Sequence, residues 1–554
     1  MKTLLVAVNC KYVHTNLALR YLKQSITSVS HASIFEFSIN DNPLSVEREI
    51  ILFSPDILAF SCYIWNIDYI LGLCSDIKKA LPDVKIILGG PEVSFDSVEV
   101  LSGNPCVDIV VKGEGELTLP LVIESIKSGK PFPHAGITYR LGGEIVDTPC
   151  ARVPDFSEIP FPYDDLSFEK SNKILYYESS RGCPYSCKYC LSGDKSNLRF
   201  KDAKDVCRDL DLFDSHGIEL VKFVDRTFNA DRKRAVRIWE HIASLVGKTR
   251  FHMEISGELL DDKAIEALGK VPSGKLQFEI GVQTTNQQTL EAIGRKSDIS
   301  KLFEKISKVL NETSIHTHLD LIVGLPYEDM ESFKKSFTDV ISLRPHVLQI
   351  GFLKVLKGSA MHTEAEKYGI VYRDKAPYEI ISNYWLTPKE ILYLKDFEFV
   401  FDKVYNSGSF NKTVDCLFSY YSDYFSVFSE LVLHFQKHNL INSQLSKADV
   451  FSHVYDCFSH LGTEFEQSLR FDYILALKSG TLPNWANTDM NFRYSDEVYA
   501  FLKDEDAKNK IMPKFFGVPA KAAIKQLRFE KIGNKVFAFD LKSSDVYDVS
   551  IYFQ

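Results

Sequence analysis

Three cysteines lie close together in one short stretch of the sequence, SSRGCPYSCKYCLSG (residues 179–193). Their spacing is C-x3-C-x2-C, formed by Cys183, Cys187 and Cys190. Thiolates are soft metal ligands, but a structural zinc site would need a fourth ligand. The nearest other thiols, Cys150 and Cys207, fall on different predicted elements, and no histidine closely follows the group. Three cysteines fit an iron–sulfur cube in which one iron keeps an open position for a substrate or cofactor.

The residues around the cysteines suit such a cluster. Small and turn-forming residues between them let the loop wrap around a bound group. Three nearby cations would offset its negative charge: Arg181, Lys188 and Lys195. We therefore predict an iron–sulfur site and disfavour both structural zinc and unligated buried thiols.

The same stretch resembles the signature of the radical S-adenosylmethionine (radical SAM) superfamily, C-x3-C-x-aromatic-C after the first strand of a β/α barrel. Tyr189 stands at the aromatic position before the third cysteine. The resemblance implies a [4Fe-4S] cluster whose open iron binds the amino and carboxylate groups of SAM. It also implies a 5'-deoxyadenosyl radical that abstracts hydrogen from the substrate, so the three cysteines are both metal ligands and the catalytic centre.

Three further stretches resemble SAM-binding segments of that superfamily: FVDRTFNAD (223–231), QFEIGVQTTNQQTL (277–290) and HLDLIVGLPYED (318–329). For any one carboxylate in them, a structural ion pair is about as expected as a cofactor contact. Glu254 joins the set if strand alternation points it into the barrel. The resemblance implies that SAM contacts Tyr189, Asp225, Asn229, Glu254, Glu279, Gln283, Gly324 and Pro326.

The N-terminal region carries glycines and polar residues after its predicted strands, in CYIWN (62–66), LGGPEVSF (88–95) and DIVVKGEGELT (108–118). Glycine lets a backbone approach a ligand closely, although a bare turn explains any one pair. A G-G-P segment and then V-D-x-V-V-x-G-E-G-E ahead of a radical SAM barrel resemble the cobalamin-binding subclass, in a branch whose C-terminal domain has unknown function. The resemblance implies that cobalamin contacts Ser61, Tyr63, Trp65, Asn66, Gly89, Gly90, Glu92, Gly113, Glu114, Gly115 and Glu116.

One motif of many cobalamin enzymes, D-x-H-x-x-G, has no clear counterpart. The nearest likeness begins at Asp214 and His216, but Glu219 replaces the glycine and the segment lies in the barrel region. We interpret it as a coincidence. Because the subclass commonly holds cobalamin without a histidine ligand, the prediction of cobalamin stands.

The elements that must position these residues follow a repeated β/α pattern. Five strand-like runs alternate with amphipathic segments in residues 1–130, which predicts a doubly wound, Rossmann-like parallel sheet of the α/β class. Residues 131–170 are predicted to be a linker that contains a hairpin. Six further strand candidates in 171–385 predict a β/α barrel with its site at the strand carboxyl ends.

The C-terminal region, residues 386–554, changes to a mostly helical pattern with a β-like finish. Its position after the barrel predicts a cap that shapes substrate specificity. The aromatic segment LFSYYSDYFSVFSELVLHF (417–435) is either a helical core or a wall that faces the substrate.

Composition narrows the classes of function. The 554-residue chain has a net charge of -9 and a pI near 5.9, which disfavours wholesale nucleic-acid binding. No apolar run is long enough to predict a transmembrane helix, and the first residues predict a strand and not a signal peptide. Eleven cysteines without a disulfide-like pattern suit a reducing compartment, so the sequence predicts a cytoplasmic protein.

These inferences together predict a cobalamin-dependent radical SAM methyltransferase that acts on an unactivated carbon through methylcobalamin and the 5'-deoxyadenosyl radical. A cyclase, isomerase or ring-rearranging enzyme with a non-methylating cobalamin is the alternative. A SAM- or corrinoid-sensing binding protein is a more remote one. The expected partners are a small-molecule or peptide substrate and a reductant such as flavodoxin or ferredoxin.

Overall fold

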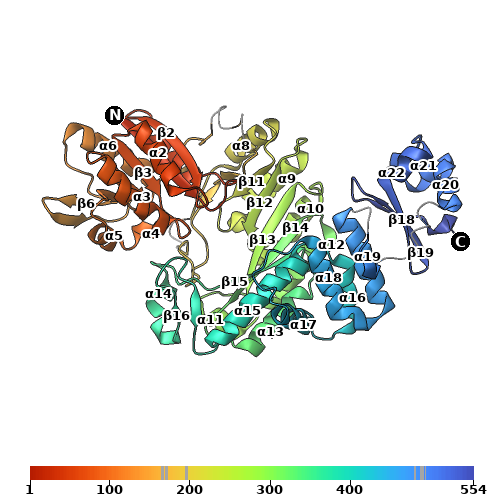
Figure 1. Ribbon diagram of the computed structural model, residues 1–554. Coiled ribbons are helices and arrows are strands. Elements are labelled where there is room, and N and C mark those ends of the chain that lie inside the picture. The colour runs from red at the N-terminus through yellow and green to blue at the C-terminus, as the bar shows by residue number, and fades with distance from the viewer. Residues whose placement is uncertain are drawn as a thin grey trace. The chain divides into compact units, whose positions relative to one another are not determined.

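A computed structural model describes residues 1–163, 168, 172–193, 198–478, 482–486, 492 and 495–553 (Figure 1). Lys195, one of the predicted cluster-side cations, lies outside these residues. The chain forms two compact units. The first comprises Met1–Ser336, Leu343–Pro345 and Gln349–Pro388, and the second comprises Phe337–Ser342, His346–Leu348 and Lys389–Gln554.

The first unit begins with a seven-stranded sheet in the order β2-β1-β3-β4-β5-β6-β7. The five strands β1 to β5 are parallel, as predicted, and the hairpin β6–β7 adds to β5 in antiparallel fashion. The strands are β1 (Lys2–Asn9), β2 (His31–Ser38), β3 (Ile57–Ser61), β4 (Lys85–Gly89), β5 (Ile109–Val111), β6 (Ile137–Leu141) and β7 (Glu144–Asp147).

Helices cover both faces of this sheet, which explains why the central strands are apolar throughout. Alternate residues of β1 join two different hydrophobic clusters: Leu4 belongs to one and Leu5 to the other. The covering helices are α1 (Leu17–Ser25), α2 (Pro43–Phe53), α3 (Ile67–Ala80), α4 (Pro91–Ser94), α5 (Ser97–Gly103) and α6 (Gly115–Ser128). A parallel sheet buried on both faces is the expected result of βαβ crossovers.

The hairpin that the sequence placed in a linker belongs structurally to this sheet. Residues of β6 pair with β5, for example Thr138 with Val110. Without the hairpin, β5 would leave a row of backbone donors and acceptors unpaired at the sheet edge. The sheet therefore extends beyond residue 130, whereas the other predicted domain boundaries stay predictions.

The second sheet of this unit has six strands in the order β15-β14-β13-β12-β11-β8, so each strand lies beside its neighbour in the sequence. The pairings among β8 and β11 to β14 are parallel, which confirms the predicted partial β/α barrel. The strands are β8 (Leu175–Tyr177), β11 (Leu220–Phe223), β12 (Arg250–Ile255), β13 (Leu276–Gln283), β14 (His316–Val323) and β15 (Val347–Phe352).

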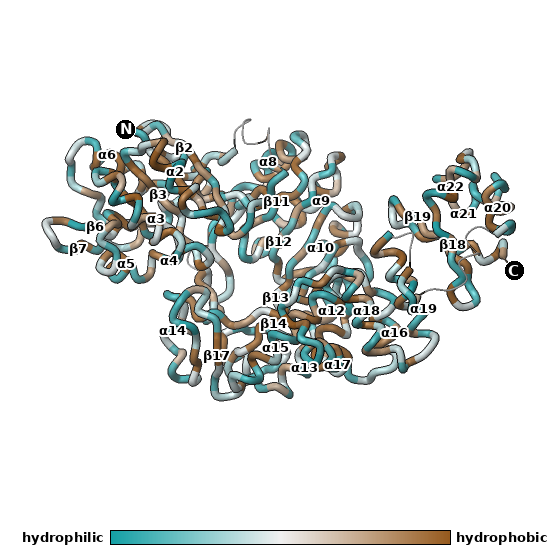
Figure 2. Tube along the Cα trace, in the orientation of Figure 1, coloured by the Kyte–Doolittle hydropathy of each residue, from teal (hydrophilic) through white to brown (hydrophobic). Residues whose placement is uncertain are grey.

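Burial alternates along the barrel strands and decides which side chains face the interior. In β13, the apolar residues from Leu276 to Val282 are buried beneath the helices, while Gln277, Glu279 and Gln283 on the other face stay partly exposed. Figure 2 shows hydrophobic and hydrophilic segments interspersed along the chain. The helices of this region are α8 (Ala203–Ser215), α9 (Arg232–Ser244), α10 (Asp262–Gly269), α11 (Gln287–Ala292), α12 (Ile299–Glu312) and α13 (Met330–Ile341).

Short elements complete the first unit. They are the antiparallel pairs β9 (Ser180–Arg181) with β10 (Arg199–Phe200) and β16 (Val371–Tyr372) with β17 (Ile380–Ser382), and helix α14 (Ala360–Glu364). The pair β9–β10 brackets the cysteine stretch and was not predicted.

The second unit is mostly helical and ends in a three-stranded antiparallel sheet, as the sequence predicted. Phe425 and Phe428 of the aromatic segment are buried against Phe397, which confirms the helical-core interpretation for them. The elements are α15 (Pro388–Phe401), α16 (Asn411–Tyr420), α17 (Tyr424–Lys437), α18 (Lys447–Phe458), α19 (Thr463–Leu477), α20 (Asp496–Lys503), α21 (Glu505–Ile511), α22 (Ala520–Gln526), β18 (Leu527–Ile532), β19 (Lys535–Asp540) and β20 (Val546–Asp548). Within the described residues, no helix combines the length and apolarity that membrane crossing requires.

Candidate active site

The three cysteines line one cavity of about 290 Å³ at the carboxyl ends of the barrel strands; below it is called the cysteine cavity. Cys183 and Cys187 are buried and Cys190 is partly exposed, and all three are free thiols. Two polar groups already approach their sulfurs. The Thr227 hydroxyl lies 3.4 Å from Cys183 Sγ, and the Ser192 amide donates to Cys190 Sγ at 3.4 Å. Three thiols on one cavity wall fit a cubane cluster with one open iron.

Backbone hydrogen bonds fix the cysteine loop against the rest of the barrel. The Lys188 amide donates to the Ile293 carbonyl at 2.9 Å, and its carbonyl accepts from the Met361 amide at 2.8 Å. The Lys188 ammonium also pairs with Glu364 at 2.8 Å. Lys188, predicted to offset cluster charge, is thus partly neutralised by this carboxylate. The loop is held from two sides before any cofactor binds.

Three carboxylates on adjacent strands form the opposite wall. Glu254 of β12 and Glu279 of β13 are paired in register, and Asp320 of β14 is paired with Gly281. Burial, and then repulsion from Glu279 and Glu254, raise the pKa of Asp320 well above its usual range. Burial also raises the pKa of Glu254. A hydrogen bond from His252 at 3.1 Å lowers the pKa of Glu279.

Several buried polar atoms around this cavity have no hydrogen-bond partner among the described residues. They include Asp320 Oδ1, Gln283 Oε1 and Arg295 Nε. Such atoms normally bind water or a ligand, because leaving them unpaired costs about 1–3 kcal/mol each. The positive φ of Gln283, 74°, reorients its backbone at the bulge between β13 and β14. The donor and acceptor set therefore fits a zwitterionic ligand beside the cluster.

Arg295 is a cavity residue that the sequence analysis missed. It follows α11, lines the cysteine cavity and donates to the Gly281 carbonyl at 2.5 Å. Burial works against its charge, but Tyr189 and Cys187 beside it raise its pKa. The sequence signal that could have identified Arg295 is a cation shortly after the SAM-binding-like stretch 277–290. Its charge is placed to offset the thiolates.

Two predicted SAM contacts, Asp225 and Asn229, are not part of the cavity wall that the described residues form. Asp225 is fully buried and accepts from the Ser179 amide and hydroxyl at 2.9 and 2.6 Å. The Asn229 side chain exchanges two hydrogen bonds of 2.9 Å with the backbone of Ser256. Their side chains hold strand ends together through these hydrogen bonds, and their direct contact with SAM stays a prediction.

Gly324 and Pro326 also stay outside the described cavity walls. Gly324 has φ of 90°, and a Cβ there would lie 2.7 Å from Ile380 Cδ1. Close packing, in addition to its backbone conformation, explains a glycine at this position. The remaining predicted contacts, among them Tyr189, Glu254, Glu279 and Gln283, line the cysteine cavity, and their role toward SAM stays a prediction.

A second cavity, of about 600 Å³, opens at the carboxyl ends of β3, β4 and β5. We call it the glycine cavity, because the strand-end glycines predicted from the sequence form part of its wall. The predicted residues that line it are Ser61, Tyr63, Gly89, Gly90, Gly113, Glu114, Gly115 and Glu116. Apolar residues of α1, such as Leu17 and Leu22, line it as well. Parallel α/β sheets bind ligands at this edge.

Two observations fit this cavity to a large, flat, partly apolar ligand. Gly90 has φ of 112°, and a Cβ there would lie 2.4 Å from the Cys62 carbonyl oxygen, so no other residue fits without moving the strand end. The buried Tyr21 hydroxyl has no partner among the described residues, and Tyr21 lines the cavity. The cavity is thus lined by close-packed backbone with one free polar group.

Three predicted cobalamin contacts are used elsewhere. Glu92 accepts from the Tyr378 hydroxyl and lies 4.0 Å from the Lys357 ammonium, so this carboxylate is turned away. Asn66 donates to the Val8 carbonyl at 2.9 Å and fixes the turn after β3. Trp65 stacks on Tyr63 and donates to the Val8 carbonyl at 3.2 Å. None of the three is in the cavity wall formed by the described residues, and their contact with cobalamin stays a prediction.

The carboxylates of the G-E-G-E segment are also paired. Arg181, just before the first cysteine, binds Glu116 and Glu178 and lies 3.3 Å from Glu114. Arg199 binds Glu114 as well. This cluster of five charged side chains therefore joins the N-terminal sheet to the start of the cysteine loop, and it leaves mainly the backbone of residues 113–116 for a ligand.

Arg226 lines both cavities and was also missed by the sequence analysis. It follows β11, and its Nη1 lies 3.7 Å from Glu254 Oε1. Its side chain is 56% exposed, so it can move. It lies on the boundary at which the two cavities approach each other.

Comparisons with known families match the three regions of the chain in order. A family described as B12 binding domain matches residues 3–123, and one described as Radical SAM superfamily matches 177–340. A family described as a protein of unknown function, DUF4080, matches 366–552.

Curated relatives match about half of this chain. The cobalamin-dependent radical SAM methyltransferase TokK of Streptomyces tokunonensis is 27% identical over 57% of this chain and 50% of its own. The 2-(S-pantetheinyl)-carbapenam-3-carboxylate methyltransferase of Streptantibioticus cattleyicolor is 28% identical over 53% of this chain and 46% of the relative. The anaerobic magnesium-protoporphyrin IX monomethyl ester cyclase of Rubrivivax gelatinosus is 23% identical over 57% of this chain and 60% of the relative. The chain thus spans about half the length of the first two relatives.

Solved structures show the same fold at low sequence identity. The cobalamin-dependent SAM radical enzyme OxsB, with aqua-cobalamin and SAM bound, is 15% identical, with a TM-score of 0.62 over 94% of this chain and 84% of its own. The radical SAM methyltransferase TsrM from Kitasatospora setae is 15% identical, with a TM-score of 0.57 over 70% and 81%. These likenesses confirm the predicted fold class.

Proposed function

We propose that this chain, a radical SAM protein with a B12-binding N-terminal domain, is a methyltransferase that acts on an unactivated carbon of a small molecule or peptide. The observation that carries the proposal is the pair of cavities in one compact unit, with Arg226 in the wall of both. One cavity presents three thiols and the other presents strand-end glycines. The methyltransferases among its relatives support the same reaction.

The residues of each cavity suit a different cofactor. Cys183, Cys187 and Cys190 would hold a [4Fe-4S] cluster, and the unpaired atoms of Gln283 and Asp320 would bind SAM beside it. The glycine cavity would hold cobalamin against the backbone at Gly89 and Gly90. When bound, the cluster and SAM supply a radical that abstracts hydrogen, and cobalamin supplies the methyl group.

The protein's own residues set up this chemistry electrostatically. Arg295 places a buried positive charge beside Cys187, which favours the thiolate needed for iron binding. Glu279, whose pKa is lowered, and the neighbouring carboxyl groups of Glu254 and Asp320 favour a sulfonium or ammonium group beside the cluster. Charges are thus preorganised on both sides of the ligand before it binds.

Arg226 would act at the boundary between the two cofactors. Its guanidinium lies 3.7 Å from Glu254, and the residue lines both cavities. We propose that it positions the substrate carbon between the radical source and the methyl donor. Because the side chain is half exposed, it would move when substrate enters.

The remaining expectations belong to the same proposal. A flavodoxin or ferredoxin would deliver the electron to the cluster, and the protein would work in the cytoplasm, where its free thiols stay reduced. Nucleic acid is not expected as a partner, because the net charge is -9.

A second candidate function is a cyclase or ring-rearranging reaction with a non-methylating corrinoid. The relative named as a magnesium-protoporphyrin IX monomethyl ester cyclase favours it. The more remote candidate, a SAM- or corrinoid-sensing protein, would bind SAM through the same polar atoms but would not need three free thiols beside them.

Labelled SAM separates these candidates. The anaerobic protein, loaded with iron, sulfide and hydroxocobalamin, is reduced and given SAM with an isotopic label in its methyl group. A methyltransferase is expected to move label onto the bound corrinoid and to form 5'-deoxyadenosine. Formation of 5'-deoxyadenosine without labelled corrinoid would support the cyclase instead. Absence of both would support the sensing protein.

A further inference from the structure

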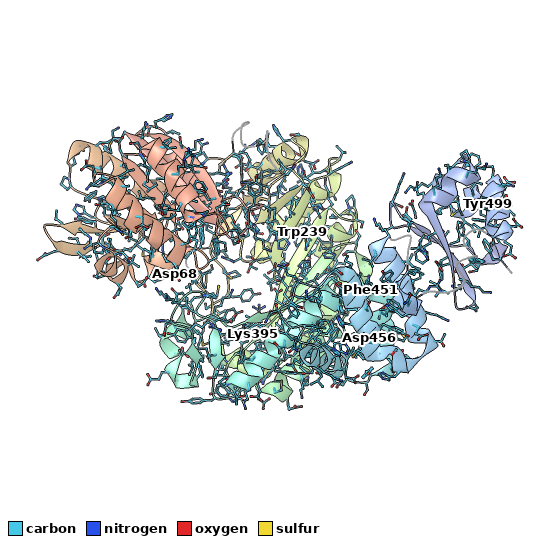
Figure 3. All side chains as sticks on the ribbon, viewed as in Figure 1. Asp68, Trp239, Lys395, Phe451, Asp456 and Tyr499 are labelled. Atoms are coloured by element: carbon cyan, nitrogen blue, oxygen red, sulfur yellow. The ribbon has the colours of Figure 1, made fainter. Side chains whose placement is uncertain are left out.

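A separate group of metal-ligating side chains lies in the second unit, on helices α17 and α18. His434, His453 and Asp456 each offer one ligand atom, and these atoms all lie within 4.8 Å of one another. His434 Nε2 and His453 Nδ1 are 3.4 Å apart. Figure 3 labels Asp456 and Phe451, both on α18. Nothing in the two cofactor cavities accounts for this group.

Helix geometry explains how the group arises from the sequence. His434 and His438 are four residues apart on α17 and the residue that follows it, and His453 and Asp456 are three apart on α18. Residues at these spacings lie on one face of a helix. Each helix therefore presents a pair of ligands toward its neighbour, an arrangement that metal sites in helical bundles use.

Buried contacts hold the two helices at this distance. Phe435 of α17 is fully buried, and its ring lies 5.9 Å from that of His453 of α18. Val450 and Val454, which flank His453 on α18, are buried as well. The histidines are half-buried at the edge of this core, and Asp456 is exposed. An ion from solvent can reach the group without unfolding it.

The separation of the ring nitrogens favours an ion over a simple contact. Zinc lies about 2.0–2.1 Å from a histidine nitrogen, so two tetrahedral ligands are about 3.3 Å apart. The observed 3.4 Å matches that separation. A hydrogen bond between the two imidazoles would satisfy these nitrogens alone, whereas one cation satisfies them and the Asp456 carboxylate together.

We propose that His434, His453 and Asp456 bind one Zn²⁺ ion that ties α17 to α18. Two imidazoles and a carboxylate favour zinc and similar borderline metals over magnesium or calcium. The fourth ligand is water or His438, whose ring centre is 4.5 Å from that of His434 and 6.2 Å from that of His453. The proposal is independent of the methyl-transfer reaction and gives the DUF4080 region a structural metal.

Zinc titration of the cluster-loaded protein tests the proposal. The cluster occupies the three cysteines, which removes them as competing ligands, and a chelator wash removes loosely bound metal. Isothermal titration with Zn²⁺ is expected to show one site per chain. Affinity should fall on the order of tenfold or more in His453→Gln and in Asp456→Asn. His460→Gln, which changes an exposed histidine of the same unit outside the group, should bind like the wild type.

A thermal measurement keeps the test decisive if His453→Gln folds poorly. Asp456 is exposed, so Asp456→Asn should fold normally. Added Zn²⁺ is expected to raise the unfolding temperature of the wild type and of His460→Gln, but not that of Asp456→Asn, and Mg²⁺ should raise none of them. Equal zinc binding and equal stabilisation in Asp456→Asn and wild type would overturn the proposal, as would a wild type that binds no zinc.

Discussion

The cysteine cavity and the glycine cavity of the same unit differ in whether their polar side chains have partners. Around the thiols, Asp320, Gln283 and Arg295 keep polar atoms without a partner among the described residues. Around the glycines, Glu114 and Glu116 are paired with arginines, so apolar side chains and the backbone of the strand ends are left to contact a ligand. The difference teaches that side chains carry recognition in the first cavity, whereas backbone shape carries it in the second.

The largest effect should follow from removing one thiol. Cys183→Ala should lower SAM cleavage on the order of a thousandfold or more, because a cluster ligand acts as part of an inseparable unit. Bound corrinoid should stay at the wild-type level, since the glycine cavity keeps its wall. Iron content, 5'-deoxyadenosine formation and corrinoid content measure the two cavities separately. Cys207→Ala, on α8, is the control. Retained cleavage in Cys183→Ala would refute the ligand assignment.

Changing the backbone of the other cavity should have the next largest effect. Gly90→Ala forces a Cβ toward the Cys62 carbonyl at a positive φ, which should cost about 1–3 kcal/mol of unfolding free energy and most of the corrinoid. Gly72→Ala, inside α3 with open space around it, should be neutral or slightly stabilising. Denaturant unfolding and corrinoid content of both variants are the measurements. Normal corrinoid in Gly90→Ala would contradict recognition by backbone shape.

Asp320→Asn should raise the free energy of unfolding and weaken the binding of SAM. Burial and neighbouring carboxylates raise the pKa of Asp320, so its charge costs stability at neutral pH. Without SAM, the variant should be about 1 kcal/mol more stable than the wild type at pH 7. That gain should vanish as the pH falls below about 4, where the carboxyl is protonated in the folded and unfolded states alike.

The same variant should bind SAM about tenfold more weakly, because it loses a charged partner for the ligand. Unfolding curves across pH and SAM titrations give the two readouts. Asp76→Asn, an exposed carboxylate of α3, should change neither by a comparable amount. A destabilised Asp320→Asn protein at pH 7 would show that this carboxylate serves the fold and not the ligand.

Arg226→Gln should have the smallest effect, because its ion pair with Glu254 is long and exposed. We expect methyl transfer to fall about two- to fivefold, while corrinoid content and SAM affinity stay at wild-type values. Rate and binding are measured on the same preparation, with Arg250→Gln at the start of β12 as the control. An equal loss in both variants would remove Arg226 from its proposed role between the cavities.

The sequence predicted the parts of this molecule that depend on short-range patterns. The alternation of strand-like runs with helical segments predicted the two sheets. The spacing of Cys183, Cys187 and Cys190 predicted three of the residues that line the cysteine cavity. Contacts over long separations were not predictable in this way. Arg295 reaches Cys187 only because the barrel closes β13 against the cysteine loop. The carboxylate of Glu92 contacts Tyr378 and Lys357, which lie far along the chain, and the sequence did not predict these contacts.

Side-chain roles were harder to predict than positions. Asp225 and Asn229 stand at the predicted strand end, yet their hydrogen-bond capacity is used by backbone and hydroxyl groups of neighbouring loops. A polar residue at the end of a strand has two competing uses, and the sequence shows only that it is polar. The two-stranded pair that brackets the cysteine loop was missed, and the predicted hairpin was not placed on β5, because pairing partners are set by the tertiary fold.

The most direct test of the two-cavity account is the corrinoid content of the desalted, anaerobically reconstituted protein with its cluster intact. The account predicts about one tightly bound corrinoid per chain, because the glycine cavity is formed before any ligand binds. A protein with a complete cluster and no bound corrinoid would contradict it, and the N-terminal sheet would then bind a different ligand.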